Sequence, residues 1–170
     1  MKSYYLILVA ALTFFTSCSK DEPSEELEIF QVMMQEEITI IDGNRSIATN
    51  RENELFEIVN NYRESIHLTA FNFEEYIYNK AADHTNFMVS QGYTSHDRFA
   101  QRAEDISNTT GAVEIAENVA NDYPTIEEAF EAWLESPEHR KSIEGDYSHS
   151  AISIKEDHNG NLYFTQIFIR

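Results

Sequence analysis

Residues 114–140 read EIAENVANDYPTIEEAFEAWLESPEHR, and this stretch places a strand, a helix and the start of a second helix in succession. In its first part, an alternation with a period of two predicts a strand in which Ile115, Glu117 and Val119 share one face. A carboxylate on an apolar face is costly unless a partner, water or a metal ion meets it. Glu117 is therefore the first candidate for a functional residue.

The middle of the stretch predicts an amphipathic helix. Thr125 and Glu128 have the spacing of a capping box, and apolar residues follow at helical spacing at Ile126, Ala129, Phe130, Trp133 and Leu134. Ser136 and Pro137 then end this helix and can begin another, with Ser136 as its N-cap. His139 falls in the first turn of that new helix. The helix dipole disfavours a charged imidazole there, which leaves His139 able to act as a neutral acceptor or as a ligand.

The N-terminus has the features of an export signal. Lys2 precedes an apolar run from Tyr4 to Phe15, and this run is too short to span a bilayer. We therefore expect residues 1–17 to be a cleaved signal peptide. Cys18, the only cysteine, follows directly and resembles the lipidated cysteine of a bacterial lipobox, although Phe15 stands where Leu is usual. The alternative is ordinary secretion with cleavage nearby.

Residues 18–48 are expected to form the lipidated cysteine and an acidic N-terminal extension. The sequence SKDEPSEE, which follows Cys18, is similar to the acidic tether with which some Gram-negative lipoproteins reach the outer face of the outer membrane. A palmitate-type anchor on Cys18 would attach the protein to the membrane. These features predict an exported lipoprotein of the bacterial outer membrane, with its folded domain exposed at the cell surface.

Composition excludes one large class of partner. The formal net charge is −18 at pH 7, and nucleic-acid binding needs clustered Lys and Arg to neutralise phosphates, so we expect no nucleic-acid partner. With 170 residues, 42% of them hydrophobic, the chain can bury one real core. We place that domain at residues 49–170. A single cysteine allows no internal disulfide, so packing alone must stabilise the domain.

Helices open the domain. Thr49 and Glu52 predict a capping box for the first helix, and Asn72 is the expected N-cap of the second, which ends near Gly92. The apolar stripe of the second helix contains His84, which we expect to be a hydrogen-bonded core residue rather than a ligand.

After Gly92 the helical pattern breaks, so a loop presents His96. A short helix is predicted over residues 98–106, with Ser95 or Asp97 as its cap. Two strands, at residues 151–155 and 162–169, end the chain around an Asn-Gly hairpin signal. The last strand is apolar on both faces and should be covered on both sides. The element order thus predicts an α+β fold, an α-β-α sandwich with a small antiparallel sheet of about three strands and helices on both faces.

Six short motifs in this order resemble the CAP superfamily (the SCP or pathogenesis-related-1 domain) in its compact bacterial form. They are NNYRE at 60–64, AADHTNFM at 81–88, SH at 95–96, AENVA at 116–120, WLESPEHR at 133–140 and YFTQIF at 163–168. Each motif is weak alone, but six in order are specific. The resemblance covers residues 50–170 and implies an α-β-α sandwich around a three-stranded antiparallel sheet.

The resemblance also implies a cleft. Many animal and plant members carry two His and two Glu in a central cleft, and some bind zinc there. His96 matches the first His of that set and Glu117 the first Glu. Tyr163 stands where the second His is usual, while His139, from the bacterial S-P-x-H-R motif, could enter the cleft instead. The implied cleft set is therefore His96, Glu117 and His139, with Tyr163 as a polar neighbour.

Two interpretations of this set stay open. His96, His139 and Glu117 have the composition of a catalytic zinc site with an open position. The same side chains could instead form a hydrogen-bonded network in which Glu117 orients a neutral His. The chain contains neither a nucleophile elbow nor an H-E-x-x-H helix, so the sequence leaves catalysis undecided.

The leading functional interpretation follows from the signal and the resemblance together. It is a cell-envelope lipoprotein whose CAP domain acts as an extracellular binding or interaction module for a lipid or envelope ligand. The alternative is a metal-dependent hydrolase that acts on peptide or envelope polymer through the cleft of His96, Glu117 and His139.

Overall fold

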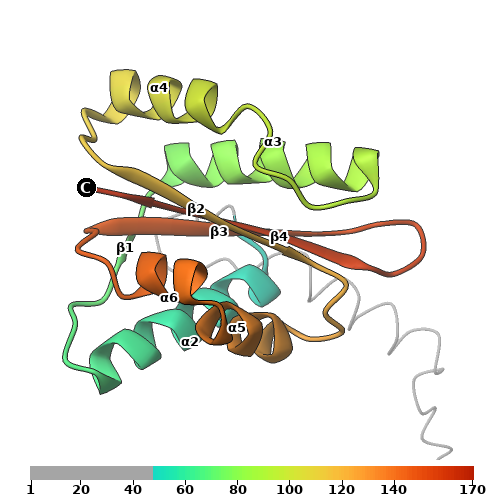
Figure 1. Ribbon diagram of the computed structural model, residues 1–170, viewed down its shortest axis with the longest axis horizontal. Coiled ribbons are helices and arrows are strands. Elements are labelled where there is room, and N and C mark those ends of the chain that lie inside the picture. Colours follow the sequence, from blue (N-terminus) through green and yellow to red (C-terminus); the bar gives the residue numbers. More distant parts are fainter. Residues whose placement is uncertain (1–47) are drawn as a thin grey trace, which may run out of the picture.

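The computed structural model describes residues 48–170, in which one sheet lies between two layers of helices (Figure 1). Strands β2 (Ile115–Asn121), β3 (His149–Glu156) and β4 (Leu162–Ile169) are antiparallel, and the sheet order is β1-β3-β4-β2. Strand β1 (Asn72–Phe73) adds two residues parallel to β3. The predicted α+β sandwich with three antiparallel strands is confirmed, and the short parallel strand is an addition to it.

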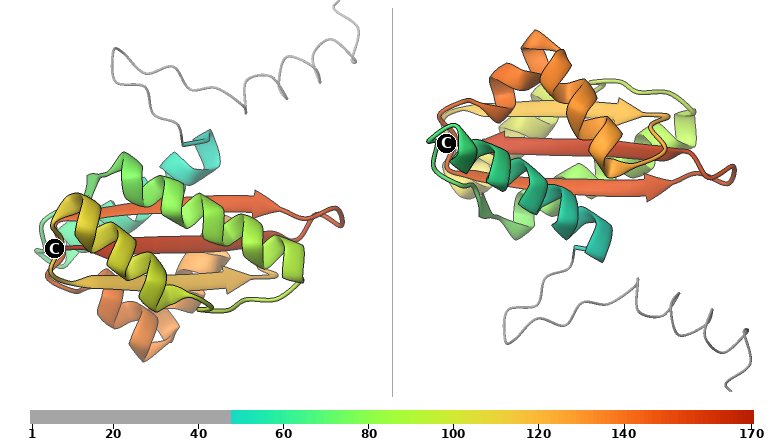
Figure 2. Two further views of the ribbon diagram at one scale, coloured as in Figure 1. Left: turned by 90° about the horizontal axis from the view of Figure 1, so that it is seen from above. Right: turned by 90° about the horizontal axis from the view of Figure 1, so that it is seen from below.

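Helices cover both faces of the sheet. The helices α3 (Glu75–Gln91) and α4 (Phe99–Thr110) lie on one face, and Figure 2 shows the other three on the opposite face: α2 (Asn50–Ser65), α5 (Ile126–Glu135) and α6 (Pro137–Ile143). All eight residues of β4 are buried as a result. This confirms the inference from its two apolar faces.

Trp133 is central to the core on the α5 side. Its side chain is 1% exposed and meets Phe164 of β4 edge to face, with ring centroids 6.3 Å apart. The indole Nε1 donates a hydrogen bond to the carbonyl of Val119, 3.3 Å away. The capping residue Thr125 accepts from the backbone of Glu128, as the sequence predicted. Helix α5 is therefore fixed both at its start and against the sheet.

Glu52 ties α2 to the rest of the domain. It completes the predicted capping box with Thr49, yet it is only 1% exposed. Its carboxylate also accepts from the backbone of Ile154 at 2.7 Å and from the hydroxyl of Tyr78 at 3.0 Å. Burial, together with the adjacent Glu52 charge, strongly raises the pKa of Tyr78. A buried carboxylate is tolerated here because each oxygen has a donor.

Two predicted helix starts are wrong. Asn72 belongs to β1, and Glu74 caps α3 instead by accepting from the backbone of Ile77. Neither Ser95 nor Asp97 caps α4. Its N-cap is Arg98, which makes no side-chain cap and has a left-handed backbone with φ 59°. Helix α4 also runs on to Thr110, where Gly111 ends it with φ 77°.

The predictions for the N-terminal part of the chain concern residues that the structure does not describe. The expected signal peptide, Cys18 and the acidic extension up to residue 47 lie outside the described part of the chain. Within residues 48–170, no helix has the length and apolar character needed to cross a membrane.

Candidate functional site

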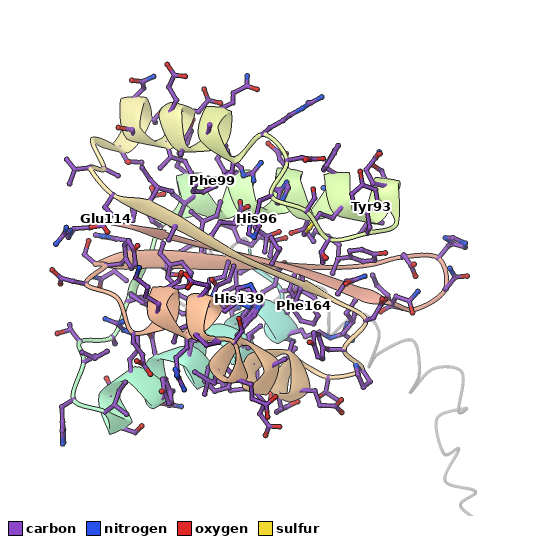
Figure 3. The ribbon with its side chains drawn as sticks, viewed as in Figure 1. Tyr93, His96, Phe99, Glu114, His139 and Phe164 are labelled. Carbon is purple, nitrogen blue, oxygen red and sulfur yellow. The ribbon has the colours of Figure 1, made fainter. Side chains whose placement is uncertain are left out.

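A cavity of about 370 Å³ runs along the outer edge of β2. It is lined by His96, Phe99, Ile115, Ala116, Glu117, Asn118, Glu138, His139 and Ser142. His96 enters from the loop before α4 and His139 from α6, and Figure 3 shows them on opposite sides of the strand. The structure therefore brings His96, Glu117 and His139 to one cavity, as the sequence analysis expected.

Tyr163 lies elsewhere. It is 2% exposed and packs against Met88 and Val119, in the layer under α3. The β2–β4 register places it opposite Asn121, at the far end of β2 from the cavity. The structure does not bring Tyr163 into the cleft, because its side chain fills the core between α3 and the sheet.

The carboxylate of Glu117 is the most constrained group of the site. Its side chain is 1% exposed, and Arg102 of α4 grips it with two hydrogen bonds, from Nε to Oε2 at 2.8 Å and from Nη2 to Oε1 at 2.8 Å. His96 Nδ1 donates to Oε1 at 2.9 Å. A forked guanidinium–carboxylate pair is the geometry that best offsets the burial of both charges. Both oxygens of Glu117 are thus bonded within the protein.

His84 adds a third neighbour to Glu117. It is buried on α3, and its Nε2 donates to the carbonyl of Ser95 at 2.7 Å. The same nitrogen lies 3.7 Å from Glu117 Oε1. Burial lowers the pKa of His84 and outweighs the attraction of the Glu117 charge. The prediction of a hydrogen-bonded core histidine is confirmed, and this histidine also borders the buried ion pair.

His139 is held against the other side of β2. Its backbone carbonyl accepts from Asn118 Nδ2 at 3.0 Å, which links α6 to the strand. Burial lowers the pKa of His139, and the nearby His96 lowers it further, so its imidazole is neutral at pH 7. The helix dipole predicted a neutral imidazole here, whereas burial is the main cause. Asn118 Oδ1 is buried and has no hydrogen-bond partner among the described residues.

Comparison with known proteins places this fold in a family. The model of the CAP family, described as the cysteine-rich secretory protein family, matches residues 56–168. The chain belongs to the CAP family. The motif resemblance is therefore confirmed, and no protein with a curated description matches the chain.

The CAP domain is also similar to solved structures. One is an outer surface protein from Borrelia burgdorferi, at 15% identity, with 69% of this chain and 90% of that one covered and a TM-score of 0.63. Another is an extracellular protein containing a SCP domain from Bacillus anthracis str. Ames, at 20% identity and a TM-score of 0.63. The match covers 82% of this chain and 49% of that one. A third is a cysteine-rich secretory protein from Staphylococcus aureus, at 17% identity and a TM-score of 0.61. The match covers 82% of this chain and 48% of that one. The chain spans about half the length of the last two, and identities this low show the fold alone.

The residues of the CAP cavity do not fit a zinc ion as they are placed. Within residues 48–170, no group of three or more His, Cys, Asp or Glu side chains is positioned to hold a metal ion. Zinc would have to compete for the oxygens of Glu117 with the hydrogen bonds from Arg102 and His96. The geometry fits the hydrogen-bonded network, which was one of the two interpretations left open. Zinc binding by His96, Glu117 and His139 is the untested alternative, and a melting experiment with zinc separates it from the network.

Arg102 is one of two site residues that the sequence patterns did not indicate. It lies on α4, and its carboxylate partner on β2 is 15 positions away in the chain. The only signal was general, since a carboxylate on an apolar strand face needs a cationic or hydrogen-bonding partner. That rule indicated that a partner exists but could not choose among the cations of the domain. Asn118 was missed as well, because its contact with His139 depends on how α6 docks.

Proposed function

We propose that this protein is an exported lipoprotein of the cell surface whose CAP domain binds an envelope component in the cavity beside β2. The observation that carries the proposal is the state of Glu117. Arg102 and His96 bond both of its oxygens, so Glu117 positions His96, and a role as a base or a metal ligand would have to compete with these bonds. A rigid, preorganised wall of this kind suits recognition.

The lining of the cavity favours one ligand class. Phe99, Ile115 and Ala116 are apolar, while the other lining residues offer imidazole, amide, hydroxyl and carboxylate groups. A lipid tail would leave these polar groups without partners, at a cost in binding free energy. Of the lipid and envelope ligands expected from the sequence, a hydrogen-bonding envelope component matches this lining better.

The proposed location rests on the N-terminal sequence. Cys18 follows an apolar signal-like run and precedes the acidic segment, the pattern of a surface lipoprotein. The fold comparisons are consistent with export, because the similar structures include an outer surface protein and an extracellular protein.

The alternative, a metal-dependent hydrolase, has one observation in its favour. His96, Glu117 and His139 do line the same cavity. A metal site would require Arg102 to release Glu117, which would leave a buried guanidinium without its partner. For this reason the binding module is the better-supported function.

The proposal is tested by filling the cavity. Ser142 lines it from α6, so Ser142→Trp should block it, whereas the exposed neighbour Lys141 is not among its lining residues and Lys141→Trp is the matched control. Both changes are made in a Cys18→Ser chain, so that no lipid anchor contributes to binding. Co-sedimentation is measured with purified peptidoglycan sacculi and with outer-membrane vesicles.

The expected result is binding by the parent chain and Lys141→Trp, and loss of binding in Ser142→Trp at an unchanged melting temperature. If the blocked variant binds both preparations as well as the parent does, the cavity is not the binding site.

A further inference from the structure

The edge of β2 that faces the cavity carries free backbone groups. Glu114 and Arg170 exchange both of their backbone hydrogen bonds, and the Asp122 amide bonds the Leu162 carbonyl. In an antiparallel pair such bonded positions alternate with unbonded ones. With the observed register, the even-numbered residues of β2 pair with β4. The amides and carbonyls of Ile115 and Glu117 therefore point away from β4.

One outward group beyond Glu117 is covered within the domain. The carbonyl of Val119 also points outward, but Trp133 Nε1 covers it at 3.3 Å. For Ile115 and Glu117, the described residues supply no hydrogen-bond partner to the backbone amide or carbonyl. Open backbone groups thus lie along the cavity, whose floor is residues 115–118.

This edge also lacks two of the usual protections against strand pairing. Exposed edges are commonly blunted by Lys, Pro or a bulge. Strand β2 reads IAENVAN and contains neither Lys nor Pro. Just before it, Val113 is 84% exposed, which extends the apolar surface beyond the end of the cavity. An edge with free backbone groups along a cavity that has apolar and polar walls is the kind of surface to which an extended peptide adds as a strand.

We propose that the cavity binds an extended peptide segment as an additional strand along β2. The proposal rests on the binding function proposed above and names its ligand class. The peptide backbone would bond the outward groups of Ile115 and Glu117. Because successive side chains of a strand point to opposite faces, alternate peptide side chains would meet the His96–Phe99 wall and the His139–Ser142 wall.

The negative charge of the protein favours basic peptides over acidic ones. The chain carries a net charge of −18, and Glu138 lies in the cavity lining. Apolar contacts are offered by Phe99 and Ile115. The fitting segment therefore combines basic and apolar side chains, since complementary charge speeds encounter and disfavours acidic partners.

The test separates backbone pairing from side-chain contact. Short random peptides displayed on phage are selected on the Cys18→Ser chain, and enriched sequences are synthesised and titrated by fluorescence polarisation. Ile115→Pro removes one outward amide without removing a bond to β4, and proline is tolerated at such edge positions. Ile115→Ala keeps the amide and shortens only the side chain. Thermal melts confirm that both variants fold.

We expect Ile115→Pro to weaken peptide binding about tenfold, as for one lost hydrogen bond with its acceptor left unpaired. Ile115→Ala should weaken it less. Methylating the peptide amides one at a time should weaken binding at every second residue. Ser142→Trp should abolish it.

Other results overturn the inference. These are no enriched peptide, equal affinity for the Ile115→Pro and Ile115→Ala variants, or methylation effects without a period of two. A dimer in sedimentation velocity that Ile115→Pro dissolves would assign the edge to a second copy of this chain instead. If sacculi or vesicles still bind in a Ser142-dependent way while peptides do not, the proposed binding function stands and only the peptide assignment fails.

Discussion

Arg102 and Glu117 form a forked ion pair that joins α4 to the edge strand β2. The two bonds run from Nε to Oε2 and from Nη2 to Oε1, each 2.8 Å long. The side chains are 10% and 1% exposed, so water screens the pair little. Because His96 bonds the same carboxylate at 2.9 Å, this pair also sets where His96 enters the cavity. The pair therefore connects the stability of α4 with the shape of the site.

Breaking this pair should destabilise the domain strongly. We expect Arg102→Met to lower the free energy of unfolding by about 3–5 kcal/mol, because it leaves a buried carboxylate without its cation. The double variant Arg102→Met, Glu117→Leu should lose less than the two single variants added together, since it buries no lone charge. Urea titration measures the free energy of unfolding of the wild type, of Arg102→Met, of Glu117→Leu and of the double variant.

The matched control is Arg98→Met. Arg98 is exposed, close to Arg102 in the chain, and stacks loosely over Phe87 with 5.8 Å to the ring centroid. Its loss should cost under about 1 kcal/mol. Equal losses for the two arginine variants would show that the ion pair has no special role.

Trp133 gives a second stability prediction. Its side chain is 1% exposed and packs on Phe164, so Trp133→Ala should cost about 3–5 kcal/mol. Trp133→Phe keeps an aromatic ring but leaves the Val119 carbonyl without a donor, and should cost about 1–3 kcal/mol from that loss. A loss below about 1 kcal/mol for the alanine variant in urea would contradict the packing of α5 described above.

Local sequence signals were sufficient to predict most of the elements. The capping box at Thr125 and the apolar repeat through Trp133 depend on residues within a few positions of each other, and both are present in the structure. The signal at Asn72 failed although Asn is favoured at helix N-caps and depleted in strands, because a tertiary contact overrides the local preference. Its pairing with His149 in β3 decides the outcome, and no local pattern contains that information.

The site was predictable only in part, for the same reason. Glu117 and His139 stand out locally, one as a charge on an apolar strand and the other in a helix first turn. Arg102 becomes the partner of Glu117 only when α4 docks beside β2. Tyr163 was placed in the cleft by its match to a motif, but its side chain points into the layer that holds Met88. The face of the sheet to which a side chain at the end of a strand points depends on the pairing register of that strand. The sequence did not determine this register.

The buried His84 and the partly buried His139 predict a pH dependence of stability. Burial lowers the pKa of both His84 and His139 in the folded protein. The unfolded chain therefore binds protons at these residues at a higher pH than the folded one. Stability is full above the ordinary histidine pKa of about 6.5 and falls as pH drops below it, by up to about 1.4 kcal/mol per pH unit for each histidine.

Urea titrations at several pH values between neutral and mildly acidic check this. His139→Asn should flatten the decline below about pH 6.5, because one of the two protonation sites is removed. The control is His158→Asn, in the exposed β3–β4 turn, which should leave the decline unchanged. A wild-type protein that gains stability on acidification through this range would contradict the assignment.

Cys18 should carry the membrane anchor. It lies outside the described residues, and the prediction rests on its place after the apolar run. We expect Cys18→Ala to move the protein from the membrane fraction to the soluble fraction, since the lipid chains provide the binding free energy. Cell fractionation followed by immunoblotting measures the change, with Ser19→Ala as the matched control. Unchanged membrane partition in Cys18→Ala would show that lipidation is not the anchor.

The effect of zinc on the melting temperature distinguishes a metal site in the cavity from a hydrogen-bonded network. A metal site on His96, Glu117 and His139 would make zinc raise the melting temperature by mass action. That gain would disappear in His96→Ala and in His139→Ala. It would also shrink below about pH 6, where protons compete for the imidazoles.

We expect no such gain, because Arg102 and His96 already occupy the oxygens of Glu117. The acidic exterior should bind zinc weakly and equally in the wild type and in both variants. Even so, His96→Ala should destabilise the domain in chelator, because Glu117 loses one hydrogen bond. The melting temperatures of the wild type, His96→Ala and His139→Ala are measured with zinc and with chelator, and the zinc-dependent shifts are compared. A zinc-dependent rise confined to the wild type would show that Arg102 yields Glu117 to the metal, and would restore the hydrolase as the leading function.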